Sequence, residues 1–289
     1  HPVTLAAAFP ELSAKLGFID AIDVAGYNYK ETLYQDHHDA YPDKPFLGSE
    51  NSHRYQDWLA VTGNDFISGQ FLWTGIDYLG EARGWPIHGA DAGLLTLAGF
   101  EKPGYYRRQS FWADDPVIHL TTVRQSDDRI TPYGEMTEDA YACEFAASIE
   151  SWNYCAGEPV TIKCYTNLNN IELFLNDKSL GTYERDPQQD CIITTVKFEP
   201  GTLTAKGSEN DIHVSHSLYT TLAACQMSVQ EYSLQPEITD LITHFIGSHN
   251  AIHQLEVTLR DGDGRRVYQD ATLLCVSVEN GMLLGLENG

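Results

Sequence analysis

The stretch that decides the fold is Pro45-Phe46-Leu47-Gly48-Ser49-Glu50-Asn51-Ser52-His53. Its apolar residues follow a proline and stop at Glu50, which predicts a short buried strand with a carboxylate at its carboxyl end. In parallel α/β barrels, the side chains that carry chemistry lie at such strand ends. Taken alone, Glu50 is more simply a solvated glutamate, because most glutamates are exposed. The sequence on either side decides between the two interpretations.

The flanking sequence alternates between strand and helix patterns. We expect buried strands at 19–29 and 69–73, on either side of the strand that ends at Glu50. A loop around Gly84-Trp85-Pro86 follows, and helix-compatible segments occupy 11–18, 31–41, 53–61 and 103–112. This order is typical of a parallel sheet. A complete barrel needs eight strands in about 250 residues. With three strands, residues 1–115 are therefore expected to be the C-terminal part of a TIM (β/α)8 barrel.

After Pro116 the pattern changes to that of antiparallel strands. Residues 160–165 and 191–198 alternate with period two, and 171–175 run into a hairpin turn at Asn176-Asp177-Lys178. Short strands separated by Gly and Asn turns predict an immunoglobulin-like β-sandwich over 116–230. The predicted fold class is therefore α/β plus all-β.

A second β-sandwich is predicted over 231–289. Residues 255–259 alternate, turn at Asp261-Gly262-Asp263-Gly264 and return through 272–278. The sequence ends at Asn288-Gly289, which we expect to lie inside this domain. It begins with His-Pro-Val-Thr, and we expect further protein upstream.

Composition and charge exclude several functions. The formal net charge of −23 over 289 residues argues against nucleic-acid binding, which needs clustered Lys and Arg. It also argues against anionic membranes, and no apolar run reaches the length of a membrane span. Lys102, Arg107 and Arg108 are expected to form a solvated helix face.

The six cysteines all lie in the second half of the chain without a Cys-x-x-Cys pair, so a zinc or redox motif is not expected. We expect reduced, mostly buried thiols and a cytoplasmic location. His37-His38-Asp39 lacks a third metal ligand at useful spacing. Asp261-Gly-Asp-Gly lacks the ligand register of a calcium loop. Neither a metal nor a cofactor is expected.

Two motifs carry a resemblance to a known family. Gly48-Ser-Glu50-Asn-Ser-His53, followed by Gly69-Gln-Phe-Leu-Trp73-Thr-Gly-Ile-Asp77-Tyr-Leu-Gly-Glu81, resembles the end of the catalytic barrel of glycoside hydrolase family 2. The nearest branch is that of the bacterial β-galactosidases. Trp152-Asn and residues 171–181 resemble the small sandwich appended in that branch, and residues 261–265 and 284–289 resemble its next sandwich. The resemblance covers nearly the whole chain but only the C-terminal portion of the family's architecture.

The resemblance implies retaining glycoside hydrolysis, in which two carboxyl groups about 5–5.5 Å apart act as nucleophile and acid/base. Glu50 matches the nucleophile, and Tyr29 matches a tyrosine that donates a hydrogen bond to it. His53 matches a sugar-binding histidine, although an exposed loop histidine is the simpler reading. Trp73 matches an aromatic floor under the sugar that precedes a non-proline cis peptide, although core packing would also explain this tryptophan.

Further residues lie where they could form the rim of a sugar pocket. Asn28 and Asp77 are assigned to substrate binding because they lie at strand ends or in adjacent loops. Glu81, Trp85 and His88 could join them, although surface polarity or loop anchoring would explain each of the five.

The acid/base residue of the family lies in an Asn-Glu pair at the end of an earlier strand. No Asn-Glu pair occurs at a strand end of the barrel part, so we expect this residue upstream of His1. The 289 residues alone are then expected to be inactive. If they are active, Asp77 and Glu81 are the candidate substitutes.

The leading interpretation is an enzyme acting on terminal β-D-galactosides. A β-glucuronidase or β-mannosidase of the same family is the alternative. A glucuronidase needs cationic or amide groups for the substrate carboxylate; Asn28-Tyr29-Lys30 has the Asn-x-Lys spacing, but its Tyr is already assigned to Glu50. A non-catalytic carbohydrate-binding or structural role of the sandwiches is the second class of function. The expected partner is a carbohydrate substrate, and a second copy of the chain is a further candidate.

Overall fold

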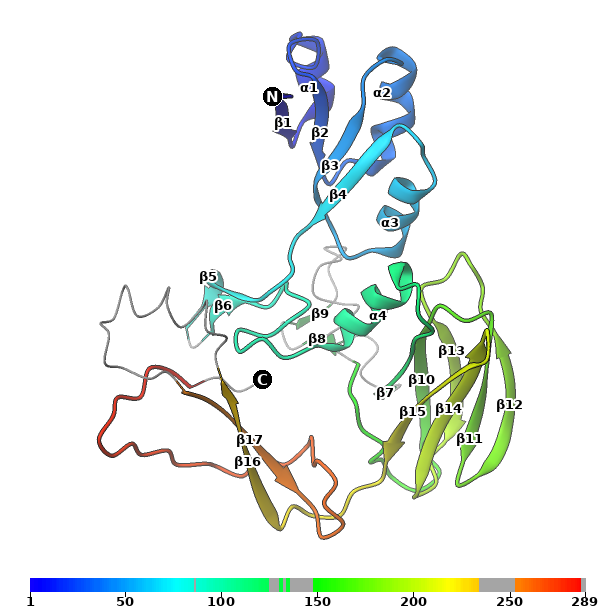
Figure 1. Ribbon diagram of the computed structural model, residues 1–289, viewed down its shortest axis with the longest axis vertical. Coiled ribbons are helices and arrows are strands. Elements are labelled where there is room, and N and C mark those ends of the chain that lie inside the picture. Colours follow the sequence, from blue (N-terminus) through cyan, green and yellow to red (C-terminus); the bar gives the residue numbers. More distant parts are fainter. Residues whose placement is uncertain (86, 125–129, 132–133, 136–147, 234–252, 287–289) are drawn as a thin grey trace.

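The computed structural model describes residues 1–85, 87–124, 130–131, 134–135, 148–233 and 253–286. A parallel sheet with helices lies at one end of the molecule, and antiparallel sheets lie at the other (Figure 1). The predicted fold class, α/β followed by all-β, is confirmed by this arrangement.

The first part of the chain forms a four-stranded parallel sheet in the order β1-β2-β3-β4. The strands are β1 (Thr4–Ala7), β2 (Val24–Asn28), β3 (Phe46–Asn51) and β4 (Ile67–Leu72). The connecting helices are α1 (Pro10–Lys15), η1 (Glu31–Leu33), α2 (Tyr34–Ala40) and α3 (Tyr55–Thr62). Buried side chains from strands and connections form one core, which includes Ile19, Ala25, Tyr27, Phe46 and Ile67.

The sequence underestimates this sheet by one strand. Strand β1 is missed because it has only four residues and three of them are exposed, so no apolar alternation marks it. The strand predicted at 19–29 begins only at Val24, since residues 17–21 form turns that start at Gly17, whose φ is +78°. Glycine adopts this left-handed conformation without a Cβ clash.

Beyond β4 the chain forms a hairpin and then a helix. The hairpin consists of β5 (Tyr78–Gly84) and β6 (Ile87–Ala90), where the sequence predicts a loop. Gly84 and the exposed Trp85 suggest a loop, but Gly84 ends β5, where it pairs with Ile87, and Trp85 lies in the hairpin's turn. Helix α4 (Pro103–Trp112) begins with a proline at its first turn, where the missing N–H costs nothing.

The second part is a β-sandwich. One sheet has the order β13-β10-β7 and the other β12-β11-β14-β15. The strands are β7 (Ile118–Arg124), β10 (Pro159–Thr166), β11 (Asn170–Leu175), β12 (Lys178–Glu184), β13 (Ile192–Lys197), β14 (Thr202–Glu209) and β15 (Ile212–Tyr219). Their inward residues pack around Trp152, which is fully buried. The predicted hairpin turn is confirmed: Asn176 and Asp177 have φ of 50° and 62°, as a type I′ turn requires. A short ladder joins β8 (Ile130–Thr131) and β9 (Gly134–Glu135).

The last described elements are β16 (Gln226–Ser233) and β17 (His253–Arg260), which pair antiparallel. The predicted domain boundary at residue 231 therefore falls inside β16. The predicted turn after β17 is present, but residues 271–278 form no strand, so the predicted return strand is wrong. Alternation in this segment marks an amphipathic pattern that pairs with no strand among the residues the structure describes.

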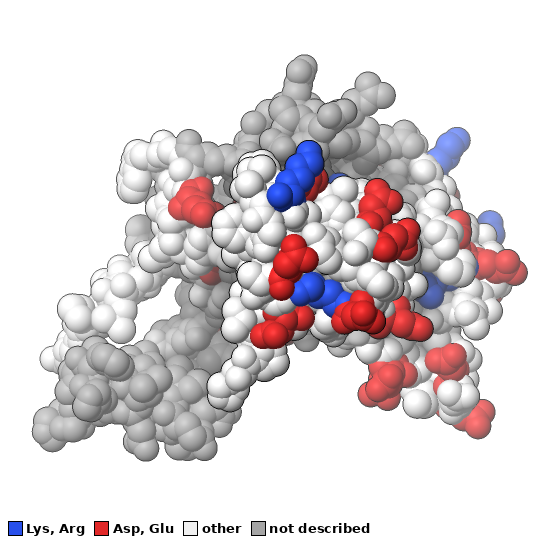
Figure 2. Space-filling model, turned by 90° about the horizontal axis from the view of Figure 1, so that it is seen from above, with Lys and Arg blue, Asp and Glu red and all other residues white. Residues whose placement is uncertain are grey.

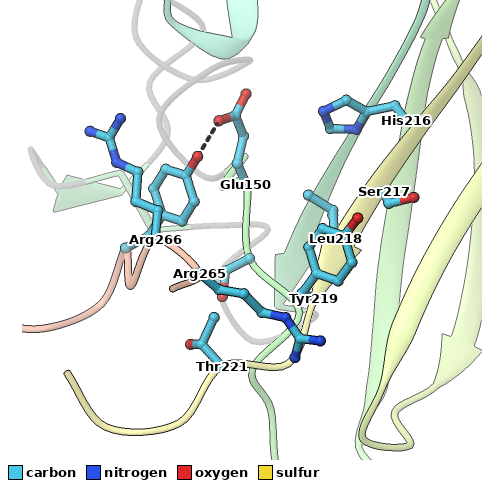
Figure 3. Close-up of a pocket in the computed structure, with 10 residues that line it drawn as sticks. Glu150, His216, Ser217, Leu218, Tyr219, Thr221, Arg265 and Arg266 are labelled. Atoms are coloured by element: carbon cyan, nitrogen blue, oxygen red, sulfur yellow. Dashed lines mark hydrogen bonds between the residues drawn. The ribbon is translucent and has the colours of Figure 1, made fainter. Parts of the chain in front are cut away.

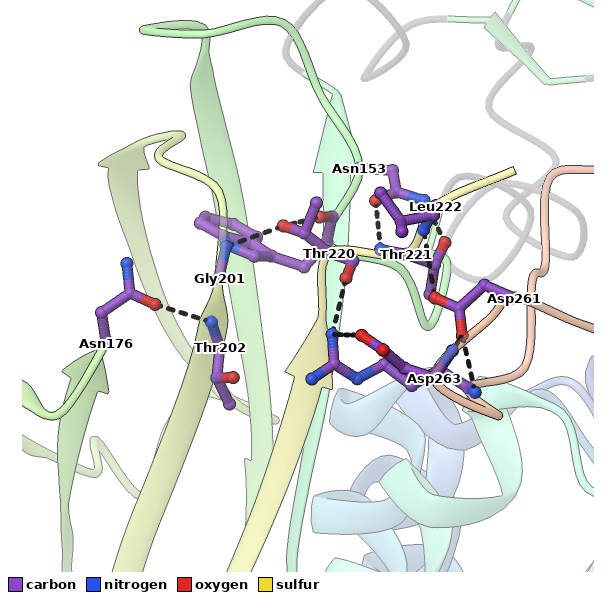
Figure 4. Close-up of polar contacts among 11 residues, drawn as sticks. Asn153, Asn176, Gly201, Thr202, Thr220, Thr221, Leu222, Asp261 and Asp263 are labelled. Atoms are coloured by element: carbon purple, nitrogen blue, oxygen red, sulfur yellow. Dashed lines mark hydrogen bonds and ion pairs between the residues drawn. The ribbon is translucent and has the colours of Figure 1, made fainter. Parts of the chain in front are cut away.

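A carboxylate fixes the turn after β17. Asp261 has no exposed surface and accepts hydrogen bonds from the backbone N–H groups of Leu222, Asp263 and Arg265 at 3.1, 3.0 and 2.9 Å (Figure 4). Desolvation opposes ionisation, yet these N–H donors hold the pKa of Asp261 below its usual range. The turn is thereby attached to the segment that leaves β15.

The surface carries the charge that the composition predicts. Figure 2 shows Asp and Glu side chains spread over the described part of one face, with fewer Lys and Arg among them. Within the described ranges, no helix combines the length and apolar content needed to cross a bilayer. Cys155, Cys164, Cys191, Cys225 and Cys275 are free; only Cys164 and Cys191 are buried, so "mostly buried" is wrong for these five, while Cys143 lies outside the described residues.

Candidate active site

The carboxyl edge of the parallel sheet brings together four residues selected from the sequence. Asn28 ends β2 and pairs in register with Glu50 of β3, while Asn51 pairs with Leu72 at the end of β4. The backbone N–H of Tyr29 donates to the Glu50 carbonyl at 2.9 Å, and that of Trp73 donates to the Asn51 carbonyl at 2.9 Å. Because parallel strands end at one edge, Asn28, Tyr29, Glu50 and Trp73 are neighbours there.

Asn28 is a direct polar partner of the Glu50 carboxylate. Its Nδ2 donates to Oε2 of the half-buried Glu50 at 3.3 Å, while its Oδ1 accepts from Ser49 Oγ at 2.8 Å. The second bond fixes the orientation of the amide, so that its NH2 group faces the carboxylate. Asn28 thereby restrains the position of the Glu50 carboxylate near the end of β3. The sequence assigned this donor role to Tyr29, and the structure adds Asn28.

Trp73 lies half-buried beside β3 and stacks edge-on against Tyr78, with ring centroids 5.6 Å apart. The Trp73–Thr74 peptide is a non-proline cis bond, as the family resemblance implies. The Tyr78 hydroxyl donates to the Glu81 carboxylate, and this bond, with burial and the charge of Glu50, raises the pKa of Tyr78. Trp73 and Tyr78 therefore form an aromatic wall just after β4.

His53 is buried, with 6 % of its surface exposed, so the exposed-loop reading is wrong. Its Nε2 lies 2.7 Å from the Ala92 carbonyl, which can only accept, so Nε2 carries the proton. Burial, together with the charges of Arg107, Arg108 and Lys102, lowers the pKa of His53 to about 4. The imidazole is therefore neutral at neutral pH.

This burial predicts a pH-dependent stability. The pKa of His53 is about 4 in the folded chain and about 6.5 in the unfolded chain. As the pH falls between these values, the unfolded chain binds a proton that the folded chain does not. The stabilisation, about 3 kcal/mol in full, is thus present above pH 6.5 and is lost toward pH 4.

The comparison of wild type with His53→Gln, in urea unfolding at pH 7.5 and pH 4.5, measures this contribution. We expect the wild type to lose about 2 kcal/mol more than the variant. The variant is needed because Glu31 has the opposite effect. Burial raises the pKa of Glu31 to about 7, so protonation of this carboxyl increases the stability of the fold as the pH falls, in wild type and variant alike. Parallel pH profiles would refute a buried neutral His53.

Asp77 is committed to structural contacts. Its carboxylate pairs with Lys102 Nζ at 2.8 and 3.1 Å and accepts from the Gly93 N–H at 2.7 Å. Lys102 also donates to the Asp91 carbonyl at 2.8 Å. These contacts anchor the loop that follows β6 to the start of α4. The contacts of Asp77 are those of a residue that anchors a loop. Its assignment to substrate binding stays a prediction.

The expectation of a solvated cationic helix face is wrong. Lys102 is ion-paired, and Arg107 and Arg108 are 3 % and 2 % exposed. The Arg108 guanidinium lies over Trp58 and Trp112, at 4.6 and 5.0 Å from the ring centroids. Burial lowers its pKa to about 10. Only the aromatic residues around these arginines hint, in the sequence, that the helix is packed on this side.

The other candidates lie on the β5–β6 hairpin or are used in packing. Glu81, Trp85 and His88 are exposed on the β5–β6 hairpin. His37 Nδ1 lies 2.7 Å from the Tyr27 hydroxyl, and His38 stacks on Phe66. In the described part of the chain, no three His, Cys, Asp or Glu side chains gather as a metal site.

Two cavities lie on the sandwich rather than at Glu50. The smaller, of about 240 Å³, lies between β15 and the segment after β17; Glu150, His216, Tyr219 and Arg265 line it, and Glu150 accepts from the Tyr268 hydroxyl (Figure 3). The larger, more open one shares Glu150 and His216. The carboxyl edge around Glu50 is therefore a polar cluster, and neither of these cavities includes it.

Known proteins share parts of this sequence. A family model described as a domain of unknown function (DUF4982) matches residues 157–215. The β-galactosidase BoGH2A of Bacteroides ovatus is 29% identical over 259 residues, which are 73% of this chain and 27% of the relative. A putative β-glucuronidase of Formosa agariphila is 30% identical over 176 residues, 57% of this chain and 14% of the relative. The chain therefore spans about a quarter or less of the curated relatives' lengths.

Solved structures share the fold. A glycosyl hydrolase family 2 member from Bacteroides cellulosilyticus superposes with a TM-score of 0.75 at 24% identity, over 92% of this chain and 35% of the other. A β-glycosidase from Bacteroides vulgatus gives 0.66 at 18% identity, over 92% and 37%. Together with the curated relatives, these matches confirm the resemblance to glycoside hydrolase family 2. Both curated relatives are named as glycosidases, which supports the glycosidase class predicted for this chain.

Proposed function

We propose that this chain carries the nucleophile of a retaining glycosidase that acts on terminal β-D-galactosides. The observation that supports it best is the position of Glu50, which ends a parallel strand beside Trp73 and accepts a hydrogen bond from Asn28. In this mechanism the Glu50 carboxylate attacks the anomeric carbon, the aglycone leaves, and water later cleaves the glycosyl ester. The proton donor is an Asn-Glu glutamate that this sequence does not contain.

A β-glucuronidase is the second candidate, because one relative is named as a putative β-glucuronidase. Its substrate carboxylate would need a cationic or amide partner, and Asn28-Tyr29-Lys30 offers that spacing. The contacts favour the galactosidase: Asn28 already binds Glu50 and Ser49, and Lys30 Nζ pairs with Glu11 at 3.2 Å. Both groups are therefore used within the chain. A β-mannosidase has no comparable observation in its favour.

Trapping the glycosyl-enzyme tests both the residue and the sugar. The chain is incubated with the 2,4-dinitrophenyl 2-deoxy-2-fluoro glycosides of galactose and of glucuronic acid, whose leaving group needs no proton donor. We expect an adduct on Glu50 by peptide mass mapping, formed at least about tenfold faster from the galactoside, because a missing polar partner costs about 1–3 kcal/mol. Faster labelling by the glucuronide would reverse the sugar assignment, and an adduct elsewhere would remove Glu50 from the mechanism.

Location and partners remain part of the proposal. Free thiols in the described chain agree with a reducing compartment, and we propose the cytoplasm. The non-catalytic alternative predicts that sugars bind residues 116–289 without any effect of Glu50→Gln, which calorimetry on the full chain and on this variant would detect. Assembly into a homo-oligomer is proposed without a specific interface.

A further inference from the structure

A loop of the sandwich reaches the barrel part beside the candidate active site. It comprises residues 185–190, between β12 and β13. The Tyr55 hydroxyl, at the start of α3, donates to the Pro187 carbonyl at 3.0 Å and accepts from Arg185 Nη2 at 3.2 Å. Helix α3 begins five positions after Glu50 in the sequence. The loop therefore lies against the element that directly follows the nucleophile strand.

Arg107 connects this loop to the backbone next to Glu50. Its Nε pairs with the Asp190 carboxylate, and its Nη1 donates to the His53 carbonyl at 2.8 Å. The side chain is 3 % exposed and its guanidinium lies over the Phe111 ring, 5.4 Å from the centroid. One buried side chain of α4 thus touches both the sandwich loop and the segment that leaves β3.

Three of the contacts that hold the segment from Glu50 to His53 involve the residues at its two ends. Asn28 binds the Glu50 carboxylate, the Ala92 carbonyl binds the His53 imidazole, and Arg107 binds the His53 carbonyl. The first two contacts come from the barrel part and its hairpin. The third depends on Asp190, because a buried guanidinium that loses its carboxylate is an uncompensated charge and must shift or take up water.

We infer that the loop at 185–190 is a positioning element of the candidate active site. Asp190 orients Arg107, and Arg107 fixes the His53 carbonyl and hence the path of the chain just after Glu50. The loop lies inside the segment matched by the domain of unknown function, so the inference gives that domain a role in the site. The catalytic part of the inference rests on the proposed function, whereas the mechanical link does not.

Hydrogen–deuterium exchange of the full chain tests the mechanical link without any substrate. In Asp190→Ala, amides of residues 51–54 are expected to exchange about tenfold faster than in wild type, while residues 24–28 of β2 keep their rate. Asp186→Ala is the matched control, since Asp186 is exposed in the same loop and its carboxylate accepts from the Gln188 N–H within that loop at 2.9 Å. Asp190→Asn, which keeps an acceptor, replaces the alanine variant if that chain does not fold. Unchanged exchange at 51–54 in a folded variant would overturn the inference.

Labelling kinetics test the catalytic consequence. With the fluorinated galactoside, Asp190→Ala is expected to lower the maximal labelling rate about tenfold, because misplacement of a reacting group costs rate, with the half-saturating concentration unchanged within about twofold. A change in half-saturation alone, or equal rates, would overturn the positioning role. If wild-type Glu50 is not labelled, the proposed function fails, and the exchange experiment still decides whether the loop holds the segment.

Discussion

Glu50→Ala is expected to abolish the burst of dinitrophenolate that 2,4-dinitrophenyl β-D-galactoside gives with the wild-type chain. The first step needs a nucleophile at the anomeric carbon but, with this leaving group, no acid. Removing a nucleophile typically lowers the rate by several orders of magnitude, and we expect at least about a thousandfold, or about 4 kcal/mol. Stopped-flow absorbance of the released phenolate measures it.

Azide provides the positive half of this experiment. The small space left by Glu50→Ala admits azide, which displaces dinitrophenolate from the same carbon with a single inversion and gives the α-galactosyl azide. We expect azide to restore phenolate release in this variant with the α-azide as product, whereas with wild type azide reacts with the glycosyl ester of Glu50 and gives the β-azide. Glu209→Ala is the matched control, because Glu209 is an exposed glutamate at the end of strand β14. Formation of the β-azide by Glu50→Ala, or loss of the burst in Glu209→Ala, would contradict the assigned role.

The sequence predicts this site well where the signal is local. An apolar run that stops at a carboxylate identifies strand β3, and the order of strands then places Tyr29 and Trp73 on either side of it. The aromatic wall at Trp73 and its cis peptide follow from the family motif. What the sequence does not indicate is the hydrogen bond from Asn28 to Glu50, because its donor and acceptor are 22 positions apart and meet only through strand register.

The errors have a common physical origin. Arg107 and Arg108 look like a solvated helix face because a cation's burial depends on partners from other parts of the chain, here Asp190, Trp58 and the His53 carbonyl. The pattern over 271–278 looks like a strand because alternation reports amphipathicity and says nothing about a pairing partner. Strand β1 escapes notice for the opposite reason, since pairing with β2 makes it a strand without any apolar pattern.

Trp152→Ala is expected to destabilise the sandwich by about 3–5 kcal/mol, the range for truncating a buried aromatic side chain. Trp152 has no exposed surface and packs against Phe198 and Tyr154, with ring centroids 5.2 and 6.0 Å away. Its Nε1 also donates to the Glu199 carbonyl at 3.1 Å. The substitution therefore leaves a cavity and an unpaired carbonyl at the centre of the core, and urea unfolding followed by circular dichroism measures the loss.

Two further variants separate these contributions. Trp152→Phe keeps most of the volume but removes the indole N–H, so that its cost is expected near about 1–3 kcal/mol. Trp85→Ala removes a side chain that is 89% exposed and is expected to change stability by no more than about 0.5 kcal/mol. A loss below about 1 kcal/mol for Trp152→Ala would mean that this residue does not organise the sandwich. The support of loop 185–190 would then have to come from other core residues. The loop connects β12 and β13, which belong to the two different sheets that enclose the core around Trp152.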